Sequence, residues 1–447
     1  MIHRRQFIAS AAAWSAVAAP AAHAAAPTAE DGFGTPAATA PFAPEVYRER
    51  RARLMAEMKT GVGLVYAAAD LNASGSDAPG PHQASDFAYL TGIQDEAGAV
   101  LVLAPAERTY KEFLLLAPRN PETERWDGAR LALGQGLRTR TGFETVGRTS
   151  SLGTLVTGIA SRSGELHFLG RLVAPGTALP PALELYSKVT ARVPGTRTVN
   201  SHDLVRRLRM VKEPRESALI RQAIAATERG LFVAMRQARV GMREHELKQL
   251  IEAEFRAAGA RALAFPSIVG SGRSSAVLHY TGGDAVIRSG DLVLCDVGAE
   301  VGGYAADITR TFPVSGRFSA EQRAVYDTVL RAQEAGMKAL KAGVIYEDVH
   351  KSARDVIEAG GHRDDFWHGL GHFVGLDVHD AGNYFVPLPA QSVETIEPGI
   401  YLPEQGFGVR IEDDYLVTDG GNEHLSRAVP RAPAEIEALL ARRHSRG

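Results

Sequence analysis

The chain has 447 residues, enough for two domains that each bury a hydrophobic core. Its 50 basic and 52 acidic side chains nearly balance at a formal net charge of −2, and no basic stripe indicates binding to nucleic acid. The single cysteine, Cys295, excludes an internal disulfide.

The first 24 residues have the pattern of an export signal peptide. Arg4 and Arg5 precede a modestly apolar stretch from Ile8 to Ala19, and Ala22-His23-Ala24 fits a small-x-small cleavage site. The arginine pair resembles a twin-arginine signal, and an ordinary Sec signal is the alternative. The apolar stretch is too short for a permanent membrane span, and no cysteine follows it for a lipid anchor. We therefore expect a periplasmic mature chain that begins at Ala25.

Residues 25–43 are rich in Ala, Pro, Thr and Gly, which predicts a disordered tether. Residues 44–205 then alternate between helical and strand patterns, which predicts an α/β N-terminal domain. Tyr47, Leu54 and Met58 recur at helical spacing. Strands are predicted at 61–69, 97–103 and 112–117.

Four side chains of this domain are candidates for the mouth of a cleft: Asp86, Phe87, Tyr89 and Trp126. A structural role in the core or in a turn is an equally good interpretation of each of these four residues.

The second domain is predicted over residues 206–447 and begins with a hinge-like segment. Pro214 suits the first turn of a helix, where a missing N–H costs nothing. Apolar spacing predicts helices at 215–238, 243–258, 321–340 and 346–358. Apolar runs predict strands at 266–271, 291–299 and 304–312.

Short segments of this second domain supply five side chains of the kinds that bind metal ions: Asp296, Asp307, His372, Glu397 and Glu412. Four carboxylates brought together would repel one another strongly unless cations neutralise them. Two divalent ions balance the four negative charges, so the sequence predicts a pair of metals if these segments converge.

The glycine pair Gly302-Gly303 predicts a two-residue hairpin turn that pairs Val301 with Tyr304. In that register Asp296 and Asp307 are diagonal neighbours on one face of the hairpin, within reach of a shared pair of metals. A slip of one residue would send one of them to the other face. Alternation also points Cys295 away from Asp296, so we expect the thiol to pack in the core.

These segments resemble the pita-bread metallopeptidases, and most of all the branch of Xaa-Pro aminopeptidase (aminopeptidase P) and prolidase. The motifs that carry the resemblance are HYTGG, HGLGH, DVHD, TIEPG and VRIEDD in the second half. YRERRARLM and SDFAYLTG carry it more weakly in the first half. The chain departs from the family at residues 389–392, where a Pro-Gly-Met-like turn is usual. The resemblance implies an α+β fold, with a pita-bread catalytic domain preceded by a smaller α/β domain.

The resemblance implies that the five candidate ligands hold two divalent ions, and the oxygen-rich set favours manganese. It also implies that Glu397 accepts the proton of the attacking water. His279 and His379 would hold the substrate carbonyl and its developing oxyanion. His368 and Arg410 would contribute to substrate binding.

The implied activity is release of the N-terminal residue from peptides with proline in second position, and we expect a homo-oligomer. Two alternatives are a prolidase restricted to Xaa-Pro dipeptides and a catalytically inactive pita-bread module that only binds peptides or proteins. The complete ligand set disfavours the inactive module, and the N-terminal motifs favour the aminopeptidase. Methionine aminopeptidases generally lack such an N-terminal domain, and a creatinase-like hydrolase would not need the five ligands.

Overall fold

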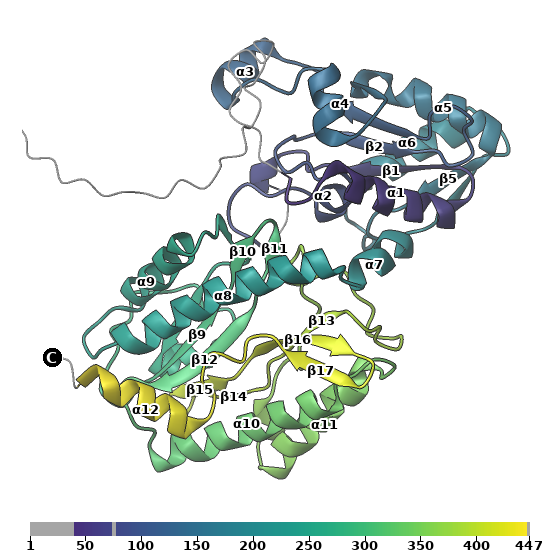
Figure 1. Cartoon of the computed structure of the whole chain (residues 1–447). Helices are drawn as coiled ribbons and strands as arrows, with labels where there is room; N and C mark the ends of the chain where they lie inside the picture. The colour runs from purple at the N-terminus through teal and green to yellow at the C-terminus, as the bar shows by residue number, and fades with distance from the viewer. Residues whose placement is uncertain (1–39, 74–76, 445–447) are drawn as a thin grey trace, which may run out of the picture.

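The computed structural model describes residues 40–73 and 77–444 (Figure 1). The predicted signal peptide, and the predicted tether up to residue 39, lie outside the described residues. No helix within these two ranges is long and apolar enough to cross a membrane.

The N-terminal half is built on one six-stranded sheet with the strand order β4-β3-β2-β1-β5-β6. Its strands are β1 (Val62–Tyr66), β2 (Val100–Leu103), β3 (Glu112–Leu116), β4 (Val146–Arg148), β5 (Glu165–Phe168) and β6 (Arg197–Asn200). Its helices are α1 (Pro44–Met58), α2 (Ser85–Thr91), α3 (Pro121–Asp127), α4 (Gln135–Thr141), α5 (Leu152–Ser163) and α6 (Pro181–Thr190). The three strands and the first helix expected from the sequence are therefore present.

Strand β2 shows why this sheet needs cover on both faces, because all four of its residues are buried. Its alternate side chains enter two different hydrophobic clusters. Leu101 and Leu103 belong to a large cluster that we call the first core, and Val100 and Val102 belong to a smaller one, the second core. The second core lies wholly within the N-terminal half, whereas the first core continues into the C-terminal half.

Helix α7 (Asp203–Met210) connects the two halves, and the predicted boundary at residues 205–206 falls within it. The C-terminal half contains two helix pairs on opposite sides of its strands (Figure 1). They are α8 (Pro214–Gln237) with α9 (Glu244–Ala257), and α10 (Ala320–Ala339) with α11 (Tyr346–Ala359). Pro214 occupies the first turn of α8, as expected. Helix α12 (Pro433–His444) closes the described chain.

The strands between these helix pairs form four small sheets. They are β7 (Ala262–Leu263), β8 (Ile268–Ser271), β9 (Leu292–Val297), β10 (Ala299–Val301), β11 (Tyr304–Ala305), β12 (Ile308–Pro313), β13 (Val393–Ile396), β14 (Gly399–Leu402), β15 (Phe407–Arg410), β16 (Asp413–Thr418) and β17 (Gly421–His424). The α+β class, with a pita-bread domain after a smaller α/β domain, is confirmed.

The glycine hairpin has the predicted register. Val301 pairs with Tyr304 across Gly302 and Gly303, whose φ angles of 62° and 84° suit a turn that favours glycine. The same register continues into β9 and β12, where Asp296 pairs with Thr309. Asp296 and Asp307 are therefore diagonal neighbours on one face. Cys295, on the other face, is fully buried in the first core, as expected.

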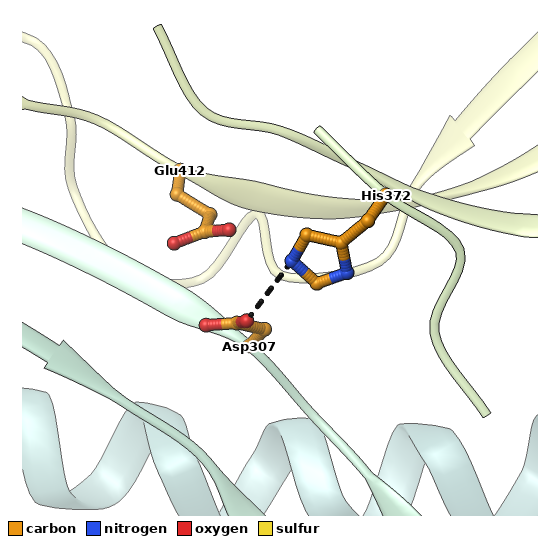
Figure 2. A group of neighbouring side chains, drawn as sticks. All are labelled: Asp307, His372 and Glu412. Carbon is orange, nitrogen blue, oxygen red and sulfur yellow. Dashed lines mark ion pairs between the residues drawn. The ribbon is translucent and has the colours of Figure 1, made fainter. Parts of the chain in front are cut away.

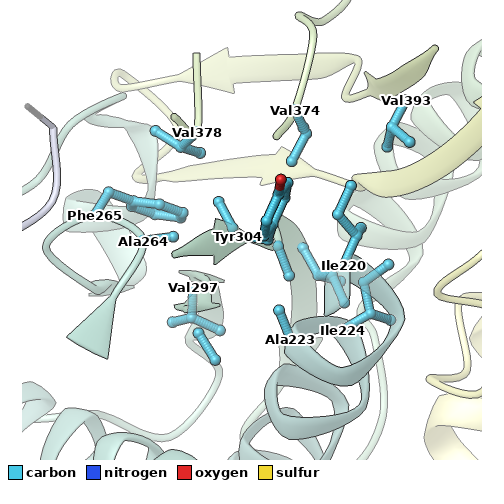
Figure 3. Packing of buried hydrophobic residues seen from close by; sticks show 14 of the residues in the cluster. Ile220, Ala223, Ile224, Ala264, Phe265, Val297, Tyr304, Val374, Val378 and Val393 are labelled. Carbon is cyan, nitrogen blue, oxygen red and sulfur yellow. The ribbon is translucent and has the colours of Figure 1, made fainter. Parts of the chain in front are cut away.

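Helix α8 holds this hairpin in place. Figure 3 shows Ile220 and Ile224 of α8 in the same packed group as Tyr304 and Val297 of the hairpin. The Tyr304 hydroxyl also donates a hydrogen bond of 2.8 Å to Glu216 Oε1 on α8. Because both ends of the hairpin are anchored in packed apolar surface, its two carboxylates have fixed positions.

Strand β13 carries an unusual buried acid, Glu394, which is 0% exposed. Neither of its carboxylate oxygens has a hydrogen-bond partner in the described part of the chain. Burial raises the pKa of Glu394 well above its ordinary value, and the nearby Ser392 hydroxyl and Lys212 ammonium only partly oppose this. A carboxyl with a raised pKa stabilises the fold below pH 4.5 and costs stability as the pH rises toward its folded-state pKa.

We therefore expect Glu394→Gln to raise the melting temperature by about 2–4 °C at pH 8. The gain should shrink as the pH falls from 8 toward 4.5, because a growing fraction of the unfolded-state carboxyls then carries the proton that the folded state retains. Thermal unfolding followed by circular dichroism measures it, with the exposed Glu122→Gln as the matched control. A gain that is equal at pH 5 and pH 8 would contradict the titration argument.

Candidate metal centre

All nine residues singled out for the site line one cavity of about 590 Å³: Asp296, Asp307, His372, Glu397, Glu412, His279, His379, His368 and Arg410. They come from separate elements that the fold brings together. Asp296 lies near the end of β9, and Asp307 lies just before β12. Glu397 follows β13, and Glu412 lies between β15 and β16. The segments that carry the predicted ligands therefore do converge.

Three of these residues could share one cation, because Asp307, His372 and Glu412 each offer a ligand atom within 4.8 Å of the other two. Figure 2 shows the two carboxylates beside the His372 ring. His372 Nε2 lies 3.4 Å from Asp307 Oδ2 and 3.6 Å from Glu397 Oε1. The arrangement places one imidazole nitrogen among several carboxylate oxygens, which suits a hard divalent cation.

Backbone contacts hold these side chains in position. The His372 N–H donates to Thr395 Oγ1 at 3.0 Å, and the Thr395 N–H donates to the His372 carbonyl at 2.8 Å, so the histidine is fixed against β13. The Glu412 N–H donates to the Thr309 carbonyl at 3.1 Å, and the Thr309 hydroxyl donates to Glu412 Oε2 at 2.6 Å. Strand β12 thus positions Glu412 and presents Asp307 at its start.

Several oxygens of the cluster have no partner of their own. Asp296 Oδ1, Asp307 Oδ1 and Glu412 Oε1 are buried and have no hydrogen-bond partner among the described residues. Buried carboxylate oxygens are costly without a partner. Three such oxygens facing one cavity fit a site built for divalent metal ions.

The pKa values of the cluster reflect the same crowding. Burial, reinforced by neighbouring carboxylates, raises the pKa of Asp307 and of Glu412 well above the ordinary range. Burial also raises the pKa of Glu397 to about 8, although the Arg410 guanidinium opposes this. Without metal, these acids therefore retain protons that a cation would displace.

His372 is poised as a neutral ligand. Burial, together with the neighbouring His379 ring, lowers the pKa of His372 to about 4, so the imidazole is uncharged near neutral pH. Its Nδ1 lies 3.2 Å from the Phe373 carbonyl, which requires the Nδ1–H tautomer if that contact is a hydrogen bond. In this tautomer the lone pair of Nε2 faces Asp307 and Glu397 and is available to a metal.

Arg410, Tyr401 and His368 form a hydrogen-bonded chain beside the cluster. Arg410 Nη2 lies 2.5 Å from Asp296 Oδ2, and Arg410 Nη1 donates to the Tyr401 hydroxyl at 2.9 Å. The same hydroxyl lies 2.8 Å from His368 Nε2. Trp367 stacks on the Tyr401 ring at a centroid distance of 5.3 Å. Tyr401 was not singled out from the sequence. Its place on β14, just after the TIEPG motif, is the signal that could have found it.

The two remaining histidines stand at the wall of the cavity. The His379 ring lies 4.3 Å from the His372 ring, and its Nδ1 lies 2.9 Å from Asp77 Oδ2. Asp77, which sequence reasoning also missed, belongs to the N-terminal half and lines the cavity with His279. No local sequence pattern predicts the contact between Asp77 and His379, because the two residues are 302 positions apart in the chain.

The candidates for the mouth of the cleft do not line this cavity. Phe87 and Tyr89 are buried in the first core, so the core alternative is correct for both. Asp86 instead forms an ion pair of 2.7 Å with Arg209. Trp126 is 88% exposed on α3. Contacts with distant segments determine where these four side chains lie, and the local sequence does not reveal those contacts.

A pita-bread fold with a buried cluster of four carboxylates and one imidazole, behind an α/β N-terminal domain, defines a metallo-exopeptidase. Residues 218–419 match metallopeptidase family M24, and residues 47–167 match the N-terminal domain of aminopeptidase P.

Curated relatives and solved structures agree with these matches. The Xaa-Pro aminopeptidase of Escherichia coli is 35% identical over 438 residues, covering 88% of this chain and 97% of the relative. The structure of the aminopeptidase PepP of Pseudomonas aeruginosa superimposes with a TM-score of 0.80 at 33% identity, covering 90% of this chain and 99% of that one. Zinc-substituted E. coli aminopeptidase P in complex with product gives a TM-score of 0.80 at 32% identity, with the same coverage. The chain therefore belongs to the Xaa-Pro aminopeptidase family of M24 metallopeptidases.

Proposed function

We propose that this chain is a di-metal aminopeptidase that releases the N-terminal residue from peptides with proline in second position. The observation that carries the proposal is the convergence of the five ligand residues on one cavity, in a chain that matches Xaa-Pro aminopeptidases across both halves. Four carboxylates support two divalent ions, and the oxygen-rich set with one imidazole supports manganese. Domains over residues 44–205 and 206–447 are part of the proposal.

The metal ions, when bound, supply the positive charge that activates water and polarises the scissile carbonyl. Glu397 lines the cavity and can therefore reach the substrate. It accepts the proton of the attacking water and passes it toward the departing amine. His279 and His379 donate hydrogen bonds to the oxygen of the scissile carbonyl. Arg410 fixes the Asp296 carboxylate, and His368 borders the substrate.

The substrate proposal is tested by peptide length. A bond that precedes proline is a tertiary amide without an N–H, so recognition depends on the proline ring and the free amine of the first residue. Neither feature requires a free carboxylate on the proline. We expect the manganese-loaded mature protein to cleave Xaa-Pro-Yaa tripeptides and longer chains, releasing one residue, and to cleave Xaa-Pro dipeptides more slowly. Xaa-Ala-Yaa peptides are the control.

Chromatography of the products distinguishes the alternatives. Cleavage of dipeptides alone would identify a prolidase instead. Binding of Xaa-Pro-Yaa without cleavage, in protein shown to contain metal, would identify a catalytically inactive module.

A periplasmic location follows from the proposed export signal. The pair Arg4 and Arg5, with the apolar stretch after it, supports the twin-arginine route, which exports folded proteins. We expect Arg4→Lys combined with Arg5→Lys to leave precursor in the cytoplasm, as shown by fractionation and mass measurement of the N-terminus. Unchanged export of the double variant, with cleavage before Ala25, would indicate the Sec route.

A homo-oligomer is also part of the proposal. Two aromatic side chains of the described surface, Trp126 and Phe385, are largely exposed, and aromatic side chains are enriched at interfaces between chains. Analytical ultracentrifugation of the mature protein tests this. A single species with the mass of one chain would refute it.

A further inference from the structure

We infer that Arg209 and Lys212 are positioning residues that hold His379 at the cavity wall and make its placement depend on the docking of the N-terminal half. The role for His379 rests on the proposed function. The inference starts from a buried cluster of charged side chains outside the cavity, formed by Arg209, Lys212, Asp86, Asp377 and Asp380.

Arg209, at the end of α7, is 5% exposed and contacts three carboxylates. Its Nη1 lies 2.7 Å from Asp86 Oδ1, on α2 of the N-terminal half. Its Nη2 lies 2.8 Å from Asp377 Oδ2 and also contacts Asp380 Oδ1, both in the segment 373–380 after His372. One guanidinium therefore joins the N-terminal half to this segment, which we call the His379 loop.

Lys212 holds the same loop from a second direction. It is 2% exposed, and its Nζ donates to Asp380 Oδ2 at 2.8 Å and to the Arg209 carbonyl at 2.8 Å. Burial alone would raise the pKa of Asp380, but the Arg209 and Lys212 cations outweigh it and keep that pKa below its ordinary value. Asp380 is therefore a carboxylate, bound by two cations.

The backbone of the His379 loop is closed tightly around these contacts. The Asp380 N–H donates to the Phe373 carbonyl at 2.8 Å, and the Gly375 N–H donates to the Asp377 carbonyl at 3.0 Å. A Cβ atom on Gly375 would lie 2.0 Å from Asp380 Oδ2 and 3.0 Å from Lys212 Cε. The loop thus fits against the Asp380 carboxylate with no room for a larger side chain.

His379 lies between the two anchored carboxylates of this loop. Asp377 and Asp380 bind the charged cluster, while Val378 and His379 line the cavity. The contact that His379 itself makes with Asp77 joins two side chains that are both more than half exposed, so water weakens it. The anchors on either side, buried at Asp380 and 20% exposed at Asp377, therefore contribute most to the position of the imidazole beside His372.

The N-terminal half enters this arrangement through two residues of α2. Asp86 pairs with Arg209, and the Ser85 hydroxyl donates to Asp377 Oδ1 at 2.5 Å. Arg209 is buried, so moving a carboxylate away from it leaves part of its charge uncompensated, which is costly. A shift of the N-terminal half would therefore disturb the contacts that hold the His379 loop.

The test compares two buried arginines, of which Arg209 joins the two halves and Arg51 does not. Arg209→Lys keeps the charge but loses the planar fork that contacts three carboxylates. Arg51→Lys is the matched control, because Arg51 on α1 is buried, pairs with Glu112 at 2.8 Å inside the N-terminal half and makes no contact with the His379 loop. We expect backbone hydrogen exchange at residues 373–380 to speed up in Arg209→Lys and to stay unchanged in Arg51→Lys.

A double-mutant cycle on kcat/KM links this loop to the reaction. We expect Arg209→Lys to lower kcat/KM for an Xaa-Pro-Yaa peptide about tenfold in the wild type and less than about twofold in His379→Ala. A general effect of Arg209→Lys on folding would lower kcat/KM by the same factor in the wild type and in His379→Ala. If Arg209→Lys does not fold, Asp86→Ala replaces it, since its side chain is 30% exposed and its loss leaves two cations with two carboxylates.

Unchanged exchange in the loop, or a full tenfold loss in the His379→Ala background, would overturn the inference. Hydrogen exchange requires no enzymatic activity. If the wild-type protein cleaves no Xaa-Pro peptide while the loop still responds, the proposed function fails and the anchoring of the His379 loop stands.

Discussion

Asp307→Asn is expected to lower kcat/KM for an Xaa-Pro-Yaa peptide by about 10³-fold or more, since it removes the charge of a proposed metal ligand from the centre of the cluster. Asp307 lies 3.4 Å from His372 Nε2 and close to Glu412, and one of its oxygens has no partner in the described chain. An amide cannot replace that charge toward a cation. The same variant should contain less metal after dialysis.

Arg410→Lys is the informative comparison. The lysine keeps a positive charge near Asp296 but cannot contact Asp296, Tyr401 and Thr309 together, as the guanidinium does. Changes to groups that orient metal ligands typically cost about 10–100-fold. The exposed Asp355→Asn on α11 controls for loss of a carboxylate elsewhere and should change neither activity nor metal content. Equal losses for Asp307→Asn and Arg410→Lys would contradict a central role for Asp307.

Binding of manganese to the chelator-treated protein is expected to release protons at pH 7 and to restore activity. Burial raises the pKa of Glu397 to about 8, so this acid carries a proton at pH 7 in the metal-free state, and burial also raises the pKa values of Asp307 and Glu412 well above their ordinary range. Metal affinity should therefore rise with pH. Isothermal titration calorimetry in buffers of different ionisation enthalpy measures the protons released.

The same pKa shifts give the sign of a stability effect. Carboxyls with raised folded-state pKa values favour the fold at low pH and disfavour it as the pH rises toward those values. Metal-free protein should therefore melt at a lower temperature at pH 9 than at pH 6, and manganese should raise the melting temperature more at pH 9. At a free concentration of 100 times Kd, one bound ion adds about 2.7 kcal/mol of stability.

Asp307→Asn should reduce both the proton release and the stabilisation. Full activity in protein shown to contain no divalent ion would refute the metal requirement altogether.

The parts of the site that could be predicted are those with a local signature. The Gly302-Gly303 turn and the alternation around it determined the face of Asp296 and Asp307, and the structure has that register. The other three ligand candidates lie in the HGLGH, TIEPG and VRIEDD motifs and were found through the resemblance of these motifs to the pita-bread metallopeptidases. Helices α8, α9, α10 and α11 also followed from apolar spacing, whereas strands β13 to β17 were not predicted.

The remaining features depend on contacts between distant segments. Asp377 meets Ser85 across 292 positions and Arg209 across 168, and nothing in the local sequence of any of the three indicates the partner. The same holds for Asp86 and Tyr89, whose neighbouring aromatic and acidic residues resemble a binding surface. Their packing against α7 and α1 placed them away from the cavity.

The first core crosses from the N-terminal half into the C-terminal half without a break, since it includes Leu54, Phe87 and Leu101 as well as Ile220, Val297 and Ile436. A chimera that joined this N-terminal half to the catalytic half of a relative would therefore need a new linker and also substitutions among the buried apolar side chains where the two halves meet. Of the two cores formed by the described residues, the second, on the far face of the N-terminal sheet, lies within one half of the chain. Substitutions there can be compensated by neighbours in the N-terminal half, whereas substitutions on the near face must also be matched by changes in the catalytic half.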